Sequence, residues 1–155
     1  MLQGTRSAGR WDDRTFDVLY TSLQADGAIA EIYYHLTKGL PVIPSKVNYH
    51  LHKLQVTISN GLKFLEVKEL EQFGLSHERF GRLSYLERPQ EYPRTQEIAE
   101  AAHFLGCDGL IVPSARWQCQ NLIVFTDRST PATLFAEEDL GRVDWVEWKQ
   151  RTDKA

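Results

Sequence analysis

The sequence predicts an α+β fold, built as a single compact domain with a mixed or antiparallel β core and flanking helices. At 155 residues, with 42% hydrophobic and 25% charged residues, the chain has the size and composition of one globular domain over residues 1–155. Segments with helical spacing and segments with strand spacing are mixed along the chain, without the strict strand–helix alternation of a parallel sheet.

The first two expected elements are a strand and a helix. Asp17 to Thr21 has the β-branched and aromatic content of a strand. A helix is expected from Asp26, a suitable N-cap, because apolar residues recur at helical spacing as far as Leu36. This helix should end before Gly39.

The middle of the chain predicts a strand, a short helix and a loop. Apolar and polar residues alternate from Leu54 to Ile58, which is typical of a strand with one buried face, and Asn60–Gly61 signals a turn. Val67 to Phe73 is expected to form a short helix that ends at Gly74. The polar stretch from Ser76 to Arg94 has weak periodicity and is expected to be mostly loop.

The last part of the chain predicts a second helix and two buried strands. Thr95 can cap the helix, and Gly106 supplies its left-handed C-terminal residue. The apolar runs Leu110–Val112 and Asn121–Phe125 are expected to form strands that pair across the connection between them. The segment from Asp139 to Trp148 fits neither a strand nor a helix, although its aromatic residues suggest that it covers core surface.

Charge and hydropathy exclude several classes of protein. The net charge of -3 gives no basic field for phosphates, so we expect no direct nucleic-acid binding. The longest apolar stretch, Gly109 to Pro113, is far shorter than the roughly 20 residues of a membrane span, and no signal sequence precedes it. We therefore expect no membrane association and a cytoplasmic location, with Cys107 and Cys119 as reduced thiols.

The sequence offers no metal site and no common catalytic motif. Phosphate-binding loops, zinc-hydrolase helices and nucleophile elbows are all missing from it. His50 and His52 share one face of a strand, but no third ligand has helpful spacing. Positions on the surface of a strand explain them more simply, and we expect no metal.

Three polar residues are candidates for a binding site, each with a simpler alternative. Arg10 lies among small residues in Gly4–Trp11, where its guanidinium can meet an anionic ligand, or it belongs to a frayed terminus. Glu31 points away from the apolar stripe of its helix, either into solvent or into a cleft that holds a ribose. Ser114 follows a buried strand, either in a simple turn or in contact with a phosphate or an amide.

Several segments together resemble the RES-domain family in order and spacing, from about Gly4 to Trp148. The matching segments are Gly9–Trp11, Val18–Tyr20, Ala30–Glu31, Thr95–Gln96, Gly109–Ala115 and Asn121–Phe125. That family, named for its Arg, Glu and Ser, contains toxins of RES-Xre toxin–antitoxin pairs. Its members degrade NAD, releasing nicotinamide to phosphate or water, and their fold is similar to that of the ADP-ribosyltransferase toxins.

The resemblance implies a role for each matching residue. Arg10 and Glu31 would be catalytic, with Arg10 also binding the NAD diphosphate or an incoming phosphate, and Glu31 stabilising positive charge at the anomeric carbon. Tyr20 would stack on nicotinamide. Ser114 would contact a phosphate or the carboxamide. Asn121 would bind substrate, or do no more than hold the Ser114 turn.

The resemblance also implies the partners of the chain. NAD is the expected substrate, inorganic phosphate a co-substrate, and no bound cofactor is expected. The protein partner would be an Xre-like antitoxin that plugs the cleft, and whether the chain also forms a homodimer stays open. Two other functions stay open. One is transfer of ADP-ribose to a protein target, and the other is a non-catalytic module that binds NAD or a partner.

Departures from the family pattern motivate the non-catalytic alternative. Ala8 stands where the family often has a glycine, and Asp12 stands where asparagine is common. Only nine residues precede Arg10, whereas the family usually has a further strand there. A sheet without that edge strand, or a trimmed start, is therefore expected.

Overall fold

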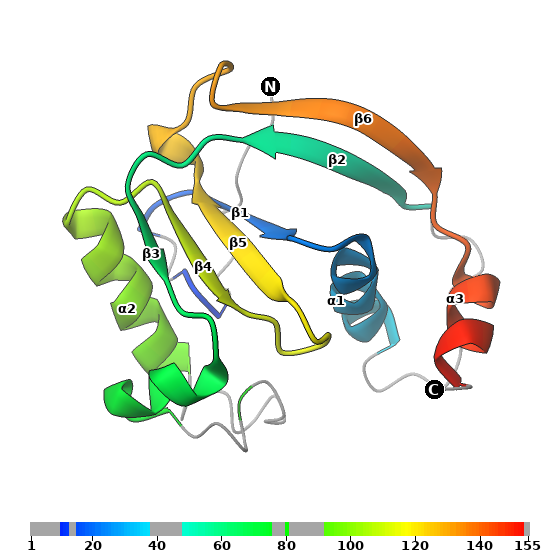
Figure 1. Cartoon of the computed structure of the whole chain (residues 1–155), viewed down its shortest axis with the longest axis horizontal. Helices are drawn as coiled ribbons and strands as arrows, with labels where there is room; N and C mark the ends of the chain where they lie inside the picture. Colours follow the sequence, from blue (N-terminus) through cyan, green and yellow to red (C-terminus); the bar gives the residue numbers. More distant parts are fainter. Residues whose placement is uncertain (1–9, 13–14, 38–47, 76–79, 81–91, 154–155) are drawn as a thin grey trace.

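The computed structural model describes residues 10–12, 15–37, 48–75, 80 and 92–153 of the chain (Figure 1). In chain order, its elements are β1 Val18–Ser22, α1 Ala25–Thr37, β2 His50–Val56, β3 Gly61–Lys63, the 3₁₀ helix η1 Val67–Phe73, α2 Tyr92–Phe104, β4 Gly109–Pro113, β5 Gln120–Phe125, the 3₁₀ turn η3 Thr126–Arg128, β6 Leu134–Arg142 and α3 Trp145–Asp153.

The strands form two sheets. The main sheet has the order β1-β5-β4-β3, in which β3 and β4 are parallel and the other pairs are antiparallel. The second sheet is a two-stranded antiparallel ribbon of β2 and β6. In Figure 1 this ribbon arches over the main sheet, with α2 at one end of the molecule and α1 and α3 at the other. The predicted α+β class with a mixed sheet and flanking helices is confirmed.

Side chains cover both faces of the central strands. Leu110, Val112 and Ile123 are fully buried on the face that α2 covers, in one cluster with Ile98 and Ala102 of that helix. The opposite face of β5 packs against the ribbon through a cluster of buried Leu122, Val124 and Leu134. Full burial of each such side chain contributes about 1.5–3 kcal/mol. Cover on both faces explains why these strands are continuous apolar runs.

A third cluster joins α1 to α3. Trp145 and Trp148 are buried against α1, where Tyr33 contacts both indole rings at centroid distances of 6.0 and 6.5 Å. An ion pair between Arg151 and Asp26, with a shortest distance of 2.9 Å, links the two helices at the surface. The expectation that these aromatic residues cover core surface is confirmed.

The predicted helix starts are wrong. α1 begins at Ala25, so Asp26 lies in its first turn and does not cap it. α2 begins at Tyr92 because Pro93 fits the first turn of a helix, where its missing N–H is not needed. Thr95 is therefore a completely buried residue inside α2, and the predicted loop ends before residue 92. The rest of that predicted loop, apart from residue 80, lies outside the described residues.

Other turns in the described residues lie where the sequence predicts them. Gly74 and Gly106 have φ values of 80° and 88°; Gly74 directly follows η1, and Gly106 follows the end of α2 by two residues, so both lie where the sequence predicts them. β4 and β5 pair antiparallel, with Gly109 opposite Val124. Asn60 precedes β3 and Gly61 opens it. The expectation about a strand before Arg10 concerns residues 1–9, which lie outside the described part of the chain.

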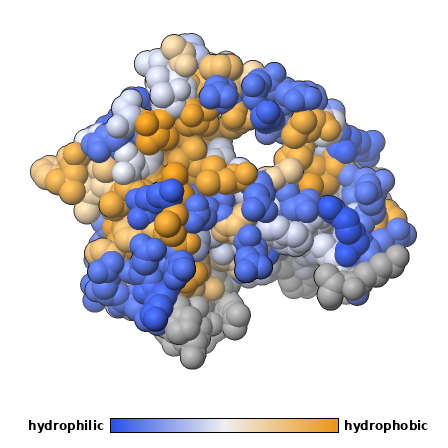
Figure 2. Space-filling model, viewed as in Figure 1, coloured by the Kyte–Doolittle hydropathy of each residue, from blue (hydrophilic) through white to orange (hydrophobic). Residues whose placement is uncertain are grey.

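The surface combines charged and apolar areas (Figure 2). At the C-terminal end of α2, Phe104 and Leu105 are 86% and 74% exposed, which makes them the most exposed large apolar residues described. None of the described helices is long and apolar enough to cross a membrane.

Candidate functional site

The candidate site begins with the close approach of α1 to the end of the main sheet. Gly27 is buried where α1 meets the sheet, and a Cβ atom at this position would lie 2.3 Å from Ser22 Oγ and 2.5 Å from Cys119 Sγ. Glu31 lies four residues further along, on the same face of the helix. The absent side chain of Gly27 thus lets α1 bring Glu31 to the ends of β4 and β5.

Glu31 accepts two hydrogen bonds at one carboxylate oxygen. Ser114 Oγ and Asn121 Nδ2 each donate to Glu31 Oε1 over 3.2 Å. The Glu31 side chain is half-buried rather than fully solvated on the outer face of the helix. Within the described residues, both of these donors meet Oε1, so the carboxylate is held at one oxygen and can meet a ligand with the other.

Ser114 organises the loop between β4 and β5. Its hydroxyl accepts from the backbone N–H groups of Arg116, at 3.1 Å, and Trp117, at 3.2 Å, while it donates to Glu31. A serine hydroxyl has one proton and two acceptor sites, so these contacts use its full capacity. Contact between Ser114 and a phosphate or carboxamide stays a prediction, and such a ligand would have to displace one of these partners.

Asn121 contacts the predicted catalytic residue directly. It lies opposite Ser22 of β1 and Val112 of β4 in the sheet register. Its side-chain amide donates to Glu31 rather than only supporting the Ser114 turn. Ser114 and Asn121 lie 83 and 90 positions after Glu31 in the sequence, so the cluster depends on the packing of α1 against the ends of β4 and β5.

Tyr20 lies on the same face of the sheet as Asn121. It pairs with Ile123, two residues along β5, which makes Tyr20 and Asn121 diagonal neighbours about 7–8 Å apart at the backbone. The Tyr20 hydroxyl donates to Asp12 Oδ1 over 2.5 Å and accepts from Trp11 N over 3.0 Å. Tyr20 is 41% exposed, so part of its surface is open to a ligand although its hydroxyl is bonded within the protein.

Arg10 is held against α2. The centre of its guanidinium lies 4.9 Å from the ring centre of Phe80 and 5.0 Å from that of Tyr92. Its backbone carbonyl accepts a hydrogen bond from the Thr95 hydroxyl. Residues 10–12 are therefore fixed against α2 and β1 and do not behave as a frayed terminus.

We expect the Tyr20 hydroxyl to make stability depend on alkaline pH. Desolvation of the hydroxyl and its hydrogen bond to Asp12 raise the pKa of Tyr20 above its ordinary value of 10.0. The unfolded chain loses this proton near the ordinary value, so the stabilising effect is complete below about pH 10 and declines above it. Urea unfolding between about pH 8 and about pH 11 measures the decline.

The matched variant for this prediction is Tyr20→Phe. It should be less stable than wild type at neutral pH, because two hydrogen bonds are lost, and should lose less stability on going to alkaline pH. Identical alkaline declines in the two proteins would show that the Tyr20 hydroxyl ionises normally.

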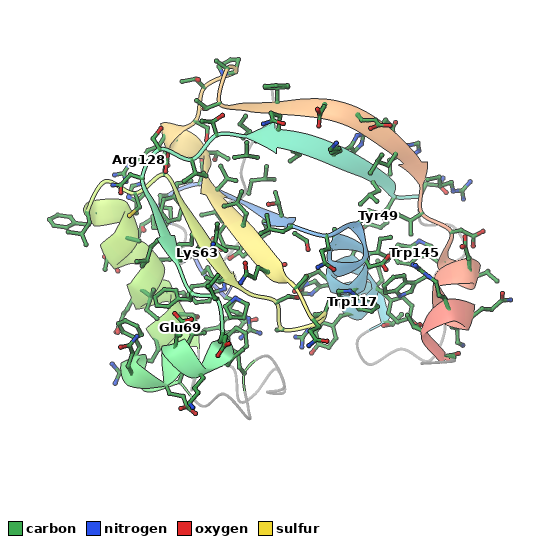
Figure 3. All side chains as sticks on the ribbon, in the orientation of Figure 1. Tyr49, Lys63, Glu69, Trp117, Arg128 and Trp145 are labelled. Atoms are coloured by element: carbon green, nitrogen blue, oxygen red, sulfur yellow. The ribbon has the colours of Figure 1, made fainter. Side chains whose placement is uncertain are left out.

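A pocket of about 560 Å³ borders Ser114 where the strands of the main sheet end. Leu65 and Trp117 contribute apolar surface, and Gln24 and Gln118 contribute polar groups. Figure 3 shows Trp117 beside α1, and it packs against the cluster that contains Trp145. The volume of the pocket lies within the range of roughly 300–1,000 Å³ that is usual for small-molecule sites.

No group of three or more His, Cys, Asp or Glu in the described part of the chain is arranged to hold a metal ion. His50 and His52 lie exposed on β2, with His50 Nδ1 3.3 Å from Asp139 Oδ2. Both histidines therefore occupy the positions on the surface of a strand that the sequence predicts.

Sequence reasoning missed several residues that build the site. Trp117 gives no signal in the sequence. Thr95 is expected there only as a helix cap, whereas its hydroxyl bonds to the carbonyl of Arg10, 85 residues away. The role of Gly27 depends partly on the distant Cys119, which a Cβ atom at this position would meet. Asp12 gave a weak signal as an acidic residue where asparagine is common. The structure buries Asp12 completely and binds it to Tyr20.

A family model described as the RES domain matches residues 2–146. The chain belongs to the RES-domain family. This match contains all five predicted site residues, which are Arg10, Tyr20, Glu31, Ser114 and Asn121. The matched range ends at the second residue of α3. Most of α3, including Trp148 that packs against α1, therefore lies beyond the match.

A solved structure supports the fold of this RES domain. A chain from the crystal structure of the M. tuberculosis MbcT–MbcA toxin–antitoxin complex superimposes with a TM-score of 0.75. The two chains share 22% sequence identity, and the alignment covers 96% of this chain and 80% of the other. At this identity, the likeness shows a shared fold alone. No curated protein matches the chain.

Proposed function

We propose that this RES domain cleaves the bond between nicotinamide and ribose in NAD, with phosphate or water as the acceptor. One observation carries the proposal, namely the Glu31 carboxylate held at Oε1 by Ser114 and Asn121. Two donors on one oxygen orient the group and leave the other oxygen for a ribose hydroxyl or for positive charge at the anomeric carbon.

The chemistry needs little besides this carboxylate. When the N-glycosidic bond breaks, its electron pair goes to the pyridinium nitrogen, so nicotinamide leaves as a neutral molecule. Positive charge then develops on the ribose, where Glu31 would stabilise it. An oxygen of phosphate or water bonds to the anomeric carbon, and an attacking water loses one proton to solvent. Positioning and charge stabilisation are sufficient for such a reaction.

The other site residues suit the remaining parts of NAD. The open surface of the Tyr20 side chain can stack on nicotinamide. The planar donors of Arg10 match the oxygens of a diphosphate or of an incoming phosphate. The pocket beside Ser114 has a volume that is usual for small-molecule sites, but Ser114 is the only one of the five candidate residues that lines it. No bound cofactor enters this scheme.

We further propose that the chain is the toxin of a toxin–antitoxin pair. The support comes from the family and from the structural neighbour, whose crystal structure is that of a toxin–antitoxin complex. An Xre-like antitoxin would then inhibit it by covering the Glu31 carboxylate and the Arg10 guanidinium. Growth arrest on expression, relieved by co-expression of such a partner, is the expected phenotype.

Nicotinamide release from NAD by the purified wild-type chain tests the activity. We expect release, and comparison of assays with and without inorganic phosphate identifies the acceptor. Phosphate dependence together with ADP-ribose 1-phosphate as product indicates a phosphorylase, whereas phosphate-independent formation of free ADP-ribose indicates a glycohydrolase. Label from NAD that becomes attached to protein would instead indicate an ADP-ribosyltransferase. Binding of NAD without release would favour the non-catalytic module.

A further inference from the structure

The segment that carries Arg10 is attached to α2 through its backbone. Thr95 donates its hydroxyl proton to the Arg10 carbonyl, and Gln96 Nε2 donates to the Asp12 carbonyl over 3.1 Å. Thr95 is completely buried, and its hydroxyl also lies 3.1 Å from the Tyr92 carbonyl one turn earlier. A threonine inside a helix usually bonds only within its own helix, so the contact with Arg10 is a distinct feature of this site.

The side chain of Arg10 is held by two aromatic rings. Phe80 and Tyr92 both lie within the roughly 6 Å at which a cation is attracted to a ring. The N–H donors of a guanidinium lie in its plane, so a ring that contacts its broad face leaves them for oxygen atoms. The rings can therefore fix the direction of the guanidinium while its donors meet oxygens of an anion.

The same segment is anchored on its other side by β1. The Tyr20 hydroxyl bridges Trp11 N and the Asp12 carboxylate, as described above. Residues 10–12 are thus held between β1 and the first turn of α2. This arrangement defines the position of Arg10 relative to the sheet face that carries Asn121.

We infer that Tyr92 and Thr95 are positioning residues that hold Arg10 for the diphosphate of the substrate. The inference rests on the proposed function and deepens it, because it assigns the beginning of α2 to recognition of the substrate's phosphates. Tyr92 acts through the direction of the guanidinium, and Thr95 acts through the backbone of Arg10. Neither residue needs to touch the reacting atoms.

The test compares variants that remove each contact with variants that keep it. Tyr92→Leu removes the ring and Thr95→Val removes the hydroxyl, whereas Tyr92→Phe and Thr95→Ser retain the ring and the hydroxyl. We expect Tyr92→Leu and Thr95→Val to raise KM for NAD about tenfold with a much smaller change in kcat. The two conservative variants should recover most of the affinity.

A control separates positioning from general damage to a helix. Thr152 of α3 also donates its hydroxyl within its own helix, to Trp148 O over 2.9 Å, but has no contact with Arg10 among the described residues. Thr152→Val should therefore leave KM unchanged. Partial unfolding would lower the active fraction and hence the apparent kcat, whereas loss of positioning raises KM. Unchanged KM in folded Tyr92→Leu and Thr95→Val would overturn the inference.

Binding of inorganic pyrophosphate, measured by calorimetry, tests the inference without any need for turnover. Wild type should bind this diphosphate, and Tyr92→Leu and Thr95→Val should weaken binding about tenfold. If folded wild type releases no nicotinamide but shows this pattern, the proposed function fails and the positioning of Arg10 stands. If wild type binds neither NAD nor pyrophosphate, both proposals are overturned.

Discussion

Replacement of Glu31 by glutamine is expected to lower kcat for nicotinamide release between about a hundredfold and a thousandfold. Glutamine has nearly the same shape, and its amide oxygen can still accept from Ser114 and Asn121. What it lacks is the negative charge that would stabilise the developing positive charge on ribose. The loss should therefore fall on kcat, with a smaller change in KM.

Nicotinamide release at saturating NAD measures this effect. Glu100→Gln provides the control, because Glu100 is an exposed residue on α2 and the exchange is chemically the same. Equal thermal unfolding of the two variants would show that Glu31→Gln is folded. A folded Glu31→Gln protein with more than about a tenth of the wild-type kcat would contradict a catalytic role for the charge. In cells, the same variant should relieve the growth arrest that wild type causes.

The elements that local sequence predicts well are those whose burial leaves a local pattern. β4 and β5 are covered on both faces, so they appear as continuous apolar runs between turn residues. β6 leaves no such pattern, because most residues between Leu134 and Arg142 are exposed. It forms a strand by pairing with β2, and this pairing partner lies far away in sequence.

Helix boundaries show a different limit. Thr95 has the chemistry of an N-cap, but Pro93 already suits the first turn of α2, and the Thr95 hydroxyl bonds to Arg10 instead. The sequence does not predict α3, because apolar Val146 lies next to Trp145 and blurs the helical spacing of Trp145 and Trp148. In the structure Val146 is 65% exposed and lies outside the buried face. Tertiary contacts with α1 decide the structure of this segment.

The candidate site could be predicted only in part. The identities of Glu31, Ser114 and Asn121 came from a family resemblance, whereas their contacts depend on the register of β5 and on the space that Gly27 leaves. The bond between Tyr20 and Asp12 joins β1 to a segment without regular structure, for which no periodic pattern exists. The contacts of Arg10 with Thr95 and Tyr92 of α2 also join distant segments, so no local sequence pattern predicts them.

Replacement of Trp148 by alanine is expected to lower the free energy of unfolding by about 3–5 kcal/mol. Trp148 is 4% exposed, and its ring lies 5.3 Å from that of Trp117 and 6.5 Å from that of Tyr33, measured between centroids. Removing it leaves a cavity between α1, α3 and the loop after β4. Urea unfolding followed by far-UV circular dichroism gives the change in the free energy of unfolding.

This variant should also affect the site, whereas its neighbour should not. Trp117 packs on Trp148, and its backbone N–H donates to the Ser114 hydroxyl that in turn holds Glu31. Trp145 is also buried but contacts Tyr33 and Tyr49, at centroid distances of 6.0 and 6.3 Å, on the ribbon side of the cluster. Trp145→Ala should therefore lose comparable stability without loosening the Ser114 loop.

The comparison of the two variants isolates the path from α3 to Glu31. Under conditions where both proteins are fully folded, Trp148→Ala should have a kcat for nicotinamide release roughly tenfold below that of Trp145→Ala, because a carboxylate that is held less firmly stabilises the transition state less well. Equal kcat values would mean that Ser114 and Asn121 fix Glu31 without help from α3. A lower value for Trp148→Ala would make the helix beyond the family match a support of the active loop.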